Sequence, residues 1–492
     1  MLVNNQFPGP TLVADWGDTL QITVKNKLHI NGTSIHWHGL RQLKTNIQDG
    51  ANGVTECPIP PGASKTYTFN ATQYGTSWYH SHFSAQYTDG VFGSIVINGP
   101  ASLPYDIDLG AYPIFDYYLE TAERIVLATQ TSPAAPPSDN VLFNGSNINP
   151  VGPGGEYSRV TLTPGKRHRL RLINPSSEHN FQVSIVGHDM TVISTDFVPV
   201  NSFTTNNVFL GIGQRVDVTI DASQPIGNYW MNVTMFAQNL CGISVNPRPA
   251  AIIHYEGAPK SNPTDPGTTP PNTNCMDSLS YSPVVRRQAP LDSFKPREEN
   301  TLDVTLEIPP LAPIVSWKVD NSSILVDWGR PVIQNIMEGN MSYPRSENII
   351  IVDEEDVWTF WVIEDATGIP HPVHLHGHDF LVLGVSAANA GPFTAADKGR
   401  LRGNNPVRRD VTMLPANGWL VLAFKTDNPG AWLFHCHIAW HVSGGFGANF
   451  LERVRDQLAQ ISPREAAAFN ANCDAWREYY KNSPYKQIDS GL

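Results

Sequence analysis

The strongest constraint on the fold of this 492-residue chain is an internal repeat, because a repeated segment implies a repeated structural unit. Residues 75–82 (GTSWYHSH) resemble residues 430–437 (GAWLFHCH), and residues 227–233 (GNYWMNV) share the pattern without the histidines. Residues 374–380 (HLHGHDF) similarly parallel residues 184–190 (SIVGHDM). The chain is therefore expected to contain three copies of one unit, of which the middle copy lacks the repeated histidines.

The repeated unit is predicted to be a β-sandwich, which makes the protein all-β. Short runs of alternating apolar and polar residues, such as 65–69 (KTYTF) and 215–220 (RVDVTI), are separated by turns, and the chain has 40 prolines and 38 glycines. We place the units at residues 1–105, 106–262 and 300–492, with a linker over residues 263–299. One helix is predicted near the C-terminus, where Ser462 supplies an N-cap before Pro463 and Glu465.

Four His-x-His pairs lie in the two outer units. They are His36 and His38, His80 and His82, His374 and His376, and His435 and His437, the last pair enclosing Cys436. Imidazole binds copper and zinc, and a thiolate adds a soft ligand that suits copper. Residues i and i+2 of a strand point to the same face, so each pair should present two imidazoles side by side while Cys436 points the opposite way. A site made from both outer units would lie at the interface between them.

The number of candidate ligands fits four copper ions. His371 precedes His374 by three residues and His441 follows Cys436 by five. A blue copper site needs two histidines and one cysteine, which His371, Cys436 and His441 supply. The eight paired histidines are enough for three further ions that hold three, three and two imidazoles. The remaining histidines do not fit this count and are expected to be structural or on the surface; they are His29, His168, His179, His188, His254 and His378.

Composition excludes several classes of partner. The net charge is −12 without a basic patch, which argues against nucleic acid, and no apolar run is long enough to span a membrane. Six Asn-x-Ser/Thr sequons favour a secreted glycoprotein; they begin at Asn31, Asn70, Asn144, Asn232, Asn321 and Asn340. Residues 1–5 do not look like a signal peptide, and the first unit starts abruptly on a probable strand, so an N-terminal segment is expected to precede it. Besides Cys436, four cysteines allow two disulfides in three possible pairings.

These motifs resemble the signatures of the multicopper oxidases and, within them, of the fungal laccases of ascomycete type. The matching segments are residues 36–39 (HWHG), 78–82 (WYHSH), 371–377 (HPVHLHG) and 435–441 (HCHIAWH). The resemblance covers nearly the whole chain. It implies three cupredoxin-like Greek-key domains with four copper ions, in a secreted and monomeric enzyme. The reaction implied is one-electron oxidation of phenols and aromatic amines, coupled to the reduction of O2 to two waters.

The resemblance also implies a role for each ligand. The type 2 copper would be held by His36 and His374, one type 3 copper by His38, His80 and His437, and the other by His82, His376 and His435. Electrons would enter at the type 1 copper near His441 and pass through Cys436 to His435 and His437.

Further residues take their expected roles from the same resemblance. Phe446, ten residues after Cys436, occupies the axial position of the type 1 copper, where most ascomycete relatives have leucine; because phenylalanine cannot coordinate, a relatively high potential is expected. The C-terminal Leu492 would plug a solvent channel toward the trinuclear cluster. The disulfides implied are Cys57–Cys473 and Cys241–Cys275.

Two acidic residues are implicated in proton transfer. Asp196 would be the carboxylate that binds substrate and accepts its proton, with an ordinary turn aspartate as the alternative. Asp49 would assist proton delivery near the type 2 copper, although Asp-Gly is also an ordinary turn.

Two other functions remain compatible with the sequence. The first is another multicopper oxidase, such as an ascorbate oxidase or a ferroxidase, and the latter needs acidic residues leading to the type 1 site. The second is a copper electron-transfer protein without turnover, for which a single blue site would suffice. The complete set of eight further histidines argues against this second alternative.

Overall fold

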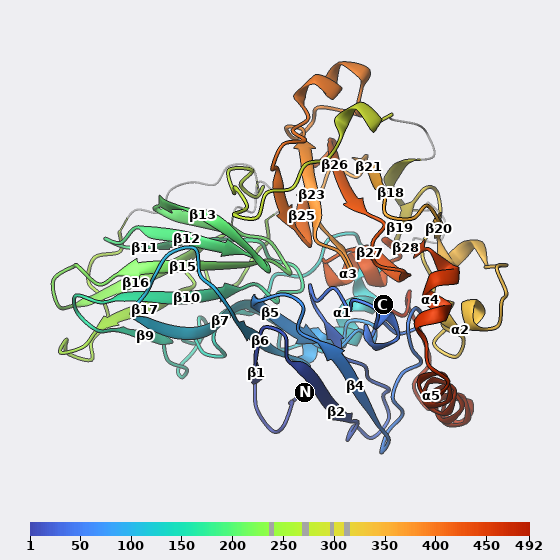
Figure 1. Ribbon diagram of the computed structural model, residues 1–492. Helices are drawn as coiled ribbons and strands as arrows, with labels where there is room; N and C mark the ends of the chain where they lie inside the picture. Colours follow the sequence, from blue (N-terminus) through green and yellow to red (C-terminus); the bar gives the residue numbers. More distant parts are fainter. Residues whose placement is uncertain (236–240, 268–274, 296–299, 309–314) are drawn as a thin grey trace.

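Figure 1 shows the computed structural model, which describes residues 1–235, 241–267, 275–295, 300–308 and 315–492. Residues 268–274 and 296–299 of the predicted linker lie outside this set. The described residues form mainly strands, arranged as three successive pairs of sheets. The prediction of an all-β fold built from repeated sandwiches is confirmed.

The first unit packs a four-stranded sheet, in the order β1-β6-β5-β3, against the hairpin-like pair β2-β4. Exposed and half-buried residues alternate along β2, as in a strand with one solvent-facing side. Antiparallel pairing of β3 with β5 sets His36 opposite His80. The bounds are β1 (Gly9–Asp15), β2 (Thr19–Lys25), β3 (His36–Trp37), β4 (Ser64–Asn70), β5 (Gly75–His80) and β6 (Phe92–Asn98).

The middle unit is a sandwich of a six-stranded sheet, β13-β12-β15-β10-β7-β8, and a five-stranded sheet, β14-β11-β16-β17-β9. It lies on the left of Figure 1. The six-stranded sheet contains β7 (Ile107–Tyr117), β8 (Asn140–Phe143), β10 (Arg167–Ile173), β12 (Met190–Thr195), β13 (Val198–Thr205) and β15 (Arg215–Asp221). The five-stranded sheet contains β9 (Arg159–Leu162), β11 (Phe181–Ile185), β14 (Asn207–Leu210), β16 (Asn228–Thr234) and β17 (Ala250–Tyr255).

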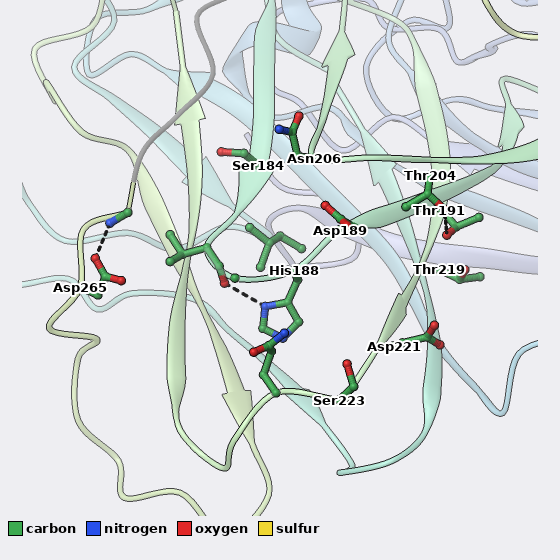
Figure 2. A pocket seen from close by; sticks show the side chains of 15 residues that line it. Ser184, His188, Asp189, Thr191, Thr204, Asn206, Thr219, Asp221, Ser223 and Asp265 are labelled. Carbon is green, nitrogen blue, oxygen red and sulfur yellow. Dashed lines mark hydrogen bonds between the residues drawn. The ribbon is translucent and has the colours of Figure 1, made fainter.

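A polar cavity of about 770 Å³ in this unit marks the repeat position without histidine pairs. Figure 2 shows Ser184 and His188 on its wall together with Asp189 and several threonines. His188 bonds the carbonyl of Val186 and the hydroxyl of Tyr255, at 2.9 and 2.7 Å. This histidine therefore has a structural role, and among the described residues no group of three candidate metal ligands includes it.

The third unit repeats the sandwich with the sheets β19-β18-β21-β26-β23-β24 and β20-β28-β27-β22-β25. Pairing of β22 with β27 sets His374 opposite His435. The first sheet contains β18 (Thr301–Glu307), β19 (Ser316–Val319), β21 (Trp358–Asp365), β23 (Phe380–Val385), β24 (Val407–Arg409) and β26 (Trp419–Lys425). The second contains β20 (Ile349–Val352), β22 (His371–Leu375), β25 (Val411–Leu414), β27 (Gly430–Cys436) and β28 (Gly447–Glu452).

The predicted C-terminal helix is present as α5 (Pro463–Lys481). Ser462 and Glu465 form its capping box, each side chain bonding the other residue's backbone N–H. Shorter helices occur in addition, and the sequence analysis did not predict them: α1 (Ala122–Thr129), α2 (Val332–Met337), α3 (Ala439–Ser443) and α4 (Val454–Gln460). They are short because tertiary contacts rather than long amphipathic repeats stabilise them.

Two disulfides form with the pairing that the family resemblance implies. Cys57–Cys473 joins the first unit to α5 across 416 residues of sequence, and Cys241–Cys275 spans 34 residues. Cys436 is the free cysteine and is fully buried.

Removing the long-range disulfide should destabilise the protein more than removing the short one. In the chain-entropy model a disulfide stabilises by about 2–4 kcal/mol, with larger values for larger loops. We expect the double variant C57S/C473S to unfold at a lower temperature than C241S/C275S, which serves as the matched control. Calorimetry of the oxidised proteins measures both, and equal transition temperatures would contradict the expectation.

Candidate metal centre

Cys436 and two histidines form one compact group of candidate ligands. The Sγ atom of Cys436 lies 3.6 Å from Nδ1 of His371 and 3.7 Å from Nδ1 of His441, and the two nitrogens are 3.1 Å apart. Trp317 stacks on His441 with ring centroids 3.8 Å apart, and only 4% of His441 is exposed. The three atoms can therefore converge on one ion, and a substrate could reach only a narrow edge of His441.

Phe446 lies beside this group. Its ring centroid is 5.0 Å from that of His371, and its backbone N–H donates to the carbonyl of His441. The side chain is fully buried. An apolar ring here offers no ligand atom and keeps water from the ion's surroundings.

The eight paired histidines gather at the interface between the first and third units. Their ring nitrogens form three groups, two of which share His38, and within each group the ligand atoms lie within 4.8 Å of one another. These groups are His36 with His38 and His374; His38 with His80 and His437; and His82 with His376 and His435. The sequence analysis expected these eight histidines to lie together between the two outer units.

The histidine pairs differ from the prediction in one respect. In each pair the first histidine ends or lies in a strand, and the second lies just beyond the strand's end. Gly39 and Gly377, which follow two of these second histidines, have φ of +73° and +69°, a conformation that favours glycine. The chain therefore turns away within the pair, and in three of the four pairs the two imidazoles join different ligand groups.

Asp49 holds two of the imidazoles in place. Its Oδ2 atom lies 2.8 Å from Nδ1 of His376, and its backbone carbonyl lies 2.8 Å from Nδ1 of His36. Both histidines thus have one nitrogen fixed by a bond and the other directed into the cluster. Such partners orient metal-binding histidines.

Asp410 plays the corresponding part on the other side, a role that the sequence analysis missed. Its carboxylate accepts from Nε2 of His38 at 3.2 Å, and its backbone carbonyl accepts from Nδ1 of His374 at 2.7 Å. The guanidinium of Arg215 donates to both carboxylate oxygens, at 2.6 and 2.7 Å. The only signal was the repeated Asp-Val-Thr at residues 410–412 and 217–219.

The chemistry of the cluster fits copper. Buried nitrogens of His36, His80, His82, His374 and His437 have no hydrogen-bond partner. Burial lowers the pKa of the imidazoles of His80, His82, His374, His435 and His437, that of His435 to about 4, so that they remain in the neutral form that binds metal. Burial also raises the pKa of the Cys436 thiol, so only a bound cation would favour its thiolate.

Asp196 differs from the role expected of it. It is 1% exposed, and its two oxygens accept from the backbone N–H of Arg215 at 3.0 Å and from the side chain of Arg409 at 3.3 Å. Burial alone would raise the pKa of Asp196, but the two arginines hold it below its ordinary value. Because both of its oxygens are bonded to arginines, this carboxylate stabilises the interface between units and is not available to a substrate.

Glu178, in the loop that contacts α3, is an acid that the sequence analysis overlooked. It is half-buried, and one of its carboxylate oxygens has no partner. Its neighbour Ser177 accepts a hydrogen bond from Ala439 at the start of α3, the helix that carries His441. Burial and the nearby Asp116 raise the pKa of Glu178 well above its usual range. Nothing in the local sequence distinguishes Glu178 from an ordinary loop residue.

Leu492 reaches the cluster from the opposite direction. The side chain is 1% exposed and lines a small cavity together with His80, His82, His435 and His437. The backbone before it is held by Trp328, whose Nε1 donates to the carbonyl of Gly491 at 2.8 Å. The last residue therefore closes one side of the histidine cluster.

Comparison with known proteins gives a consistent assignment. Three family models described as multicopper oxidase match residues 1–102, 110–258 and 321–456. Laccase-1 of Melanocarpus albomyces is 58% identical over 504 residues, covering 100% of this chain and 81% of that protein. A laccase of Cryphonectria parasitica is 56% identical over 507 residues, covering 100% and 85%. The crystal structure of a laccase from Botrytis aclada superposes with a TM-score of 0.93 at 38% identity, covering 100% of this chain and 90% of that one.

Replacing Asp410 should weaken metal binding in the histidine cluster without abolishing the Cys436 group. Loss of an orienting partner typically costs about 10–100-fold in metal affinity, so we expect D410N to keep its blue absorption and lose copper from the cluster. Metal analysis and the electron paramagnetic resonance of the non-blue copper measure the two sites separately.

The matched control is D217N. Asp217 is the repeat counterpart of Asp410 in the middle unit and pairs with Arg169 and Arg171 rather than with histidines. Full copper content in D410N, or an equal loss in D217N, would contradict the orienting role.

Proposed function

The chain belongs to the multicopper oxidase family, and on that basis we propose that it is a laccase, which oxidises phenols and aromatic amines by one electron and reduces O2 to two waters. The observation that carries this proposal is the spatial division of the ligands into a cysteine group and an eight-histidine cluster. One group can accept single electrons, and the other offers enough imidazoles for a multinuclear site. The high identity to laccases over the full chain supports the same function.

When bound, the copper ions would supply the one-electron chemistry and the binding of O2. We propose His371, Cys436 and His441 as ligands of the type 1 ion, and His36 with His374 as ligands of the type 2 ion. The type 3 ions would be held by His38, His80 and His437, and by His82, His376 and His435. The three groups of nitrogens within reach of one another support this assignment.

Cys436 connects the two centres through covalent bonds. Its side chain belongs to the type 1 group, while its neighbours His435 and His437 belong to the two type 3 groups. Cys436 points away from His435 in β27, and the chain leaves the strand before His437, so one tripeptide serves both centres. Reduction of O2 is thereby separated from the surface at which phenols are oxidised.

Glu178 is the proposed acceptor for the phenolic proton. Loss of an electron makes a phenol strongly acidic, so Glu178 would speed the step by taking the proton in its ionised form, which its raised pKa confines to higher pH. The free carboxylate oxygen and the contact of its loop with α3 support this role. Asp49, which contacts His36 and His376, is the proposed counterpart that handles protons at the histidine cluster.

Several properties of the whole protein follow from the proposal. We propose the units 1–105, 106–262 and 300–492 as its domains and Leu492 as a plug of the channel to the cluster. Secretion as a monomeric glycoprotein is supported by the sequons, none of whose asparagines is buried. Among the described residues no helix is both long and apolar enough to cross a membrane.

Oxygen uptake with a methoxyphenol tests the function directly. We expect four phenoxyl radicals for each O2 consumed and no peroxide, because the electrons are collected before water is released. Absence of O2 uptake in a copper-loaded preparation would contradict the laccase proposal. Uptake with ferrous iron in its place would identify a ferroxidase, and uptake with ascorbate alone an ascorbate oxidase.

The variant E178Q tests the proton acceptor. Positioned bases contribute about 10²–10⁴-fold, and because water replaces part of this, we expect kcat/KM for phenols to fall by at least about tenfold. Ferrocyanide loses no proton and should be oxidised at nearly the wild-type rate. E156Q, at an exposed position of the middle unit, is the charge-matched control; an equal loss with both reductants would contradict the assignment.

A further inference from the structure

A column of aromatic side chains runs from the histidine cluster to α5. Phe83 follows His82 in sequence and stacks on Trp328 with ring centroids 4.3 Å apart. Tyr485 contacts both of these rings, at 5.8 Å from Phe83 and 6.2 Å from Trp328. Tyr480 lies 6.0 Å from Trp328 on the other side. The column therefore connects half-buried tyrosines to Phe83 through ring contacts, and Phe83 is covalently linked to the candidate copper ligand His82.

The hydroxyl of Tyr485 has a route for its proton. It bonds the side chain of Ser84, and the Ser84 hydroxyl donates to the carboxylate of Asp489. Burial raises the pKa of Asp489 to about 6, so the carboxylate is ionised at neutral pH and can accept a proton. Burial raises the pKa of Tyr485 well above its ordinary value, so the phenol keeps its proton until it loses an electron.

A second tyrosine near the cluster is closed off from external reductants. The ring centroid of Tyr87 lies 5.3 Å from that of His80. Tyr87 thus contacts a proposed ligand directly, whereas Tyr485 is separated from the ligands by other rings. The Tyr87 hydroxyl faces the backbone carbonyls of Ser176 and His437, each at 3.4 Å. The hydroxyl also bonds Ser177 and lies near Asp116, but Tyr87 is only 5% exposed, so an external reductant could not reach it to restore it.

We propose that Tyr485 is a redox-active residue that supplies one electron to O2 reduction when the phenol has delivered too few. The inference rests on the proposed laccase function, which supplies O2 as the oxidant. The electron leaves the Tyr485 ring and travels by way of Phe83 and Trp328 toward His82. The hydroxyl proton moves through Ser84 to Asp489, which leaves a neutral tyrosyl radical and a carboxylic acid.

An external reductant at the surface restores the tyrosine. An external phenol gives one electron to the Tyr485 radical and becomes a phenoxyl radical, while the proton on Asp489 returns through Ser84, so that the tyrosine and the carboxylate are restored. The phenol releases its own proton to solvent, which balances the proton that O2 reduction takes up for this electron. Reduction of O2 to two waters still consumes four electrons and four protons, of which one electron comes through the column. The half-buried position of Tyr485 and Tyr480 gives an external reductant access. The column would thus keep a partly reduced site from oxidising its own ligands.

Freeze-quenched electron paramagnetic resonance tests the proposal with a readout independent of turnover. The copper-loaded protein is reduced with fewer than four equivalents of ferrocyanide, which gives no organic radical, and is then mixed with O2. We expect an organic radical signal that narrows when the tyrosines carry deuterated rings. The signal should be lost in Y485F and in D489N, which keeps the ring and removes the base.

The control is Y157F, because Tyr157 makes a comparable contact with Trp230 at 4.8 Å in the middle unit, which lacks candidate copper ligands. That variant should keep the full signal. A signal that persists in Y485F, or that disappears in Y87F alone, would overturn the assignment. Absence of any radical from wild-type protein that still consumes O2 with a methoxyphenol would overturn the relay and leave the laccase function intact.

Discussion

The arrangement of the three units depends on one buried cation, the guanidinium of Arg215. It donates to Asp410 of the third unit and to the carbonyl of Thr76 in the first, while its backbone belongs to β15 of the middle unit. A buried charge that loses its partner costs about 3–5 kcal/mol, so the three units are held in one relative placement. The same Asp410 orients two cluster histidines, which couples the packing of the units to the geometry of the metal site.

The middle unit has no histidine pair, yet the structure depends on it. Its position equivalent to a histidine pair holds Ser184 and Val186 around a polar cavity. It contributes contacts between units instead. Arg215 and Asp196 lie where the units meet, and the loop with Ser177 and Glu178 packs against α3. The unit thus aligns the two outer units and forms part of the proposed substrate side.

The sequence predicted the fold and singled out the candidate metal ligands because both are encoded locally, in alternating strands and in fixed spacings such as those around Cys436. It did not predict Asp410 or Glu178, since each acts through neighbours distant in sequence and neither stands in a distinctive motif. Asp196 illustrates the converse error, because a residue that looked like a substrate carboxylate pairs with arginines from two units. Burial and charge partners, which decide such roles, arise only from tertiary packing.

The separation of the ligands along the chain has a consequence for biosynthesis. His38 and His437 face each other at 3.3 Å although 399 residues separate them. During synthesis the first histidines leave the ribosome long before their partners exist, so no complete multinuclear site is available to a nascent chain. Metal insertion must therefore follow folding of the whole polypeptide. Because the ligands are then buried, the ions would have to enter through openings in the folded protein.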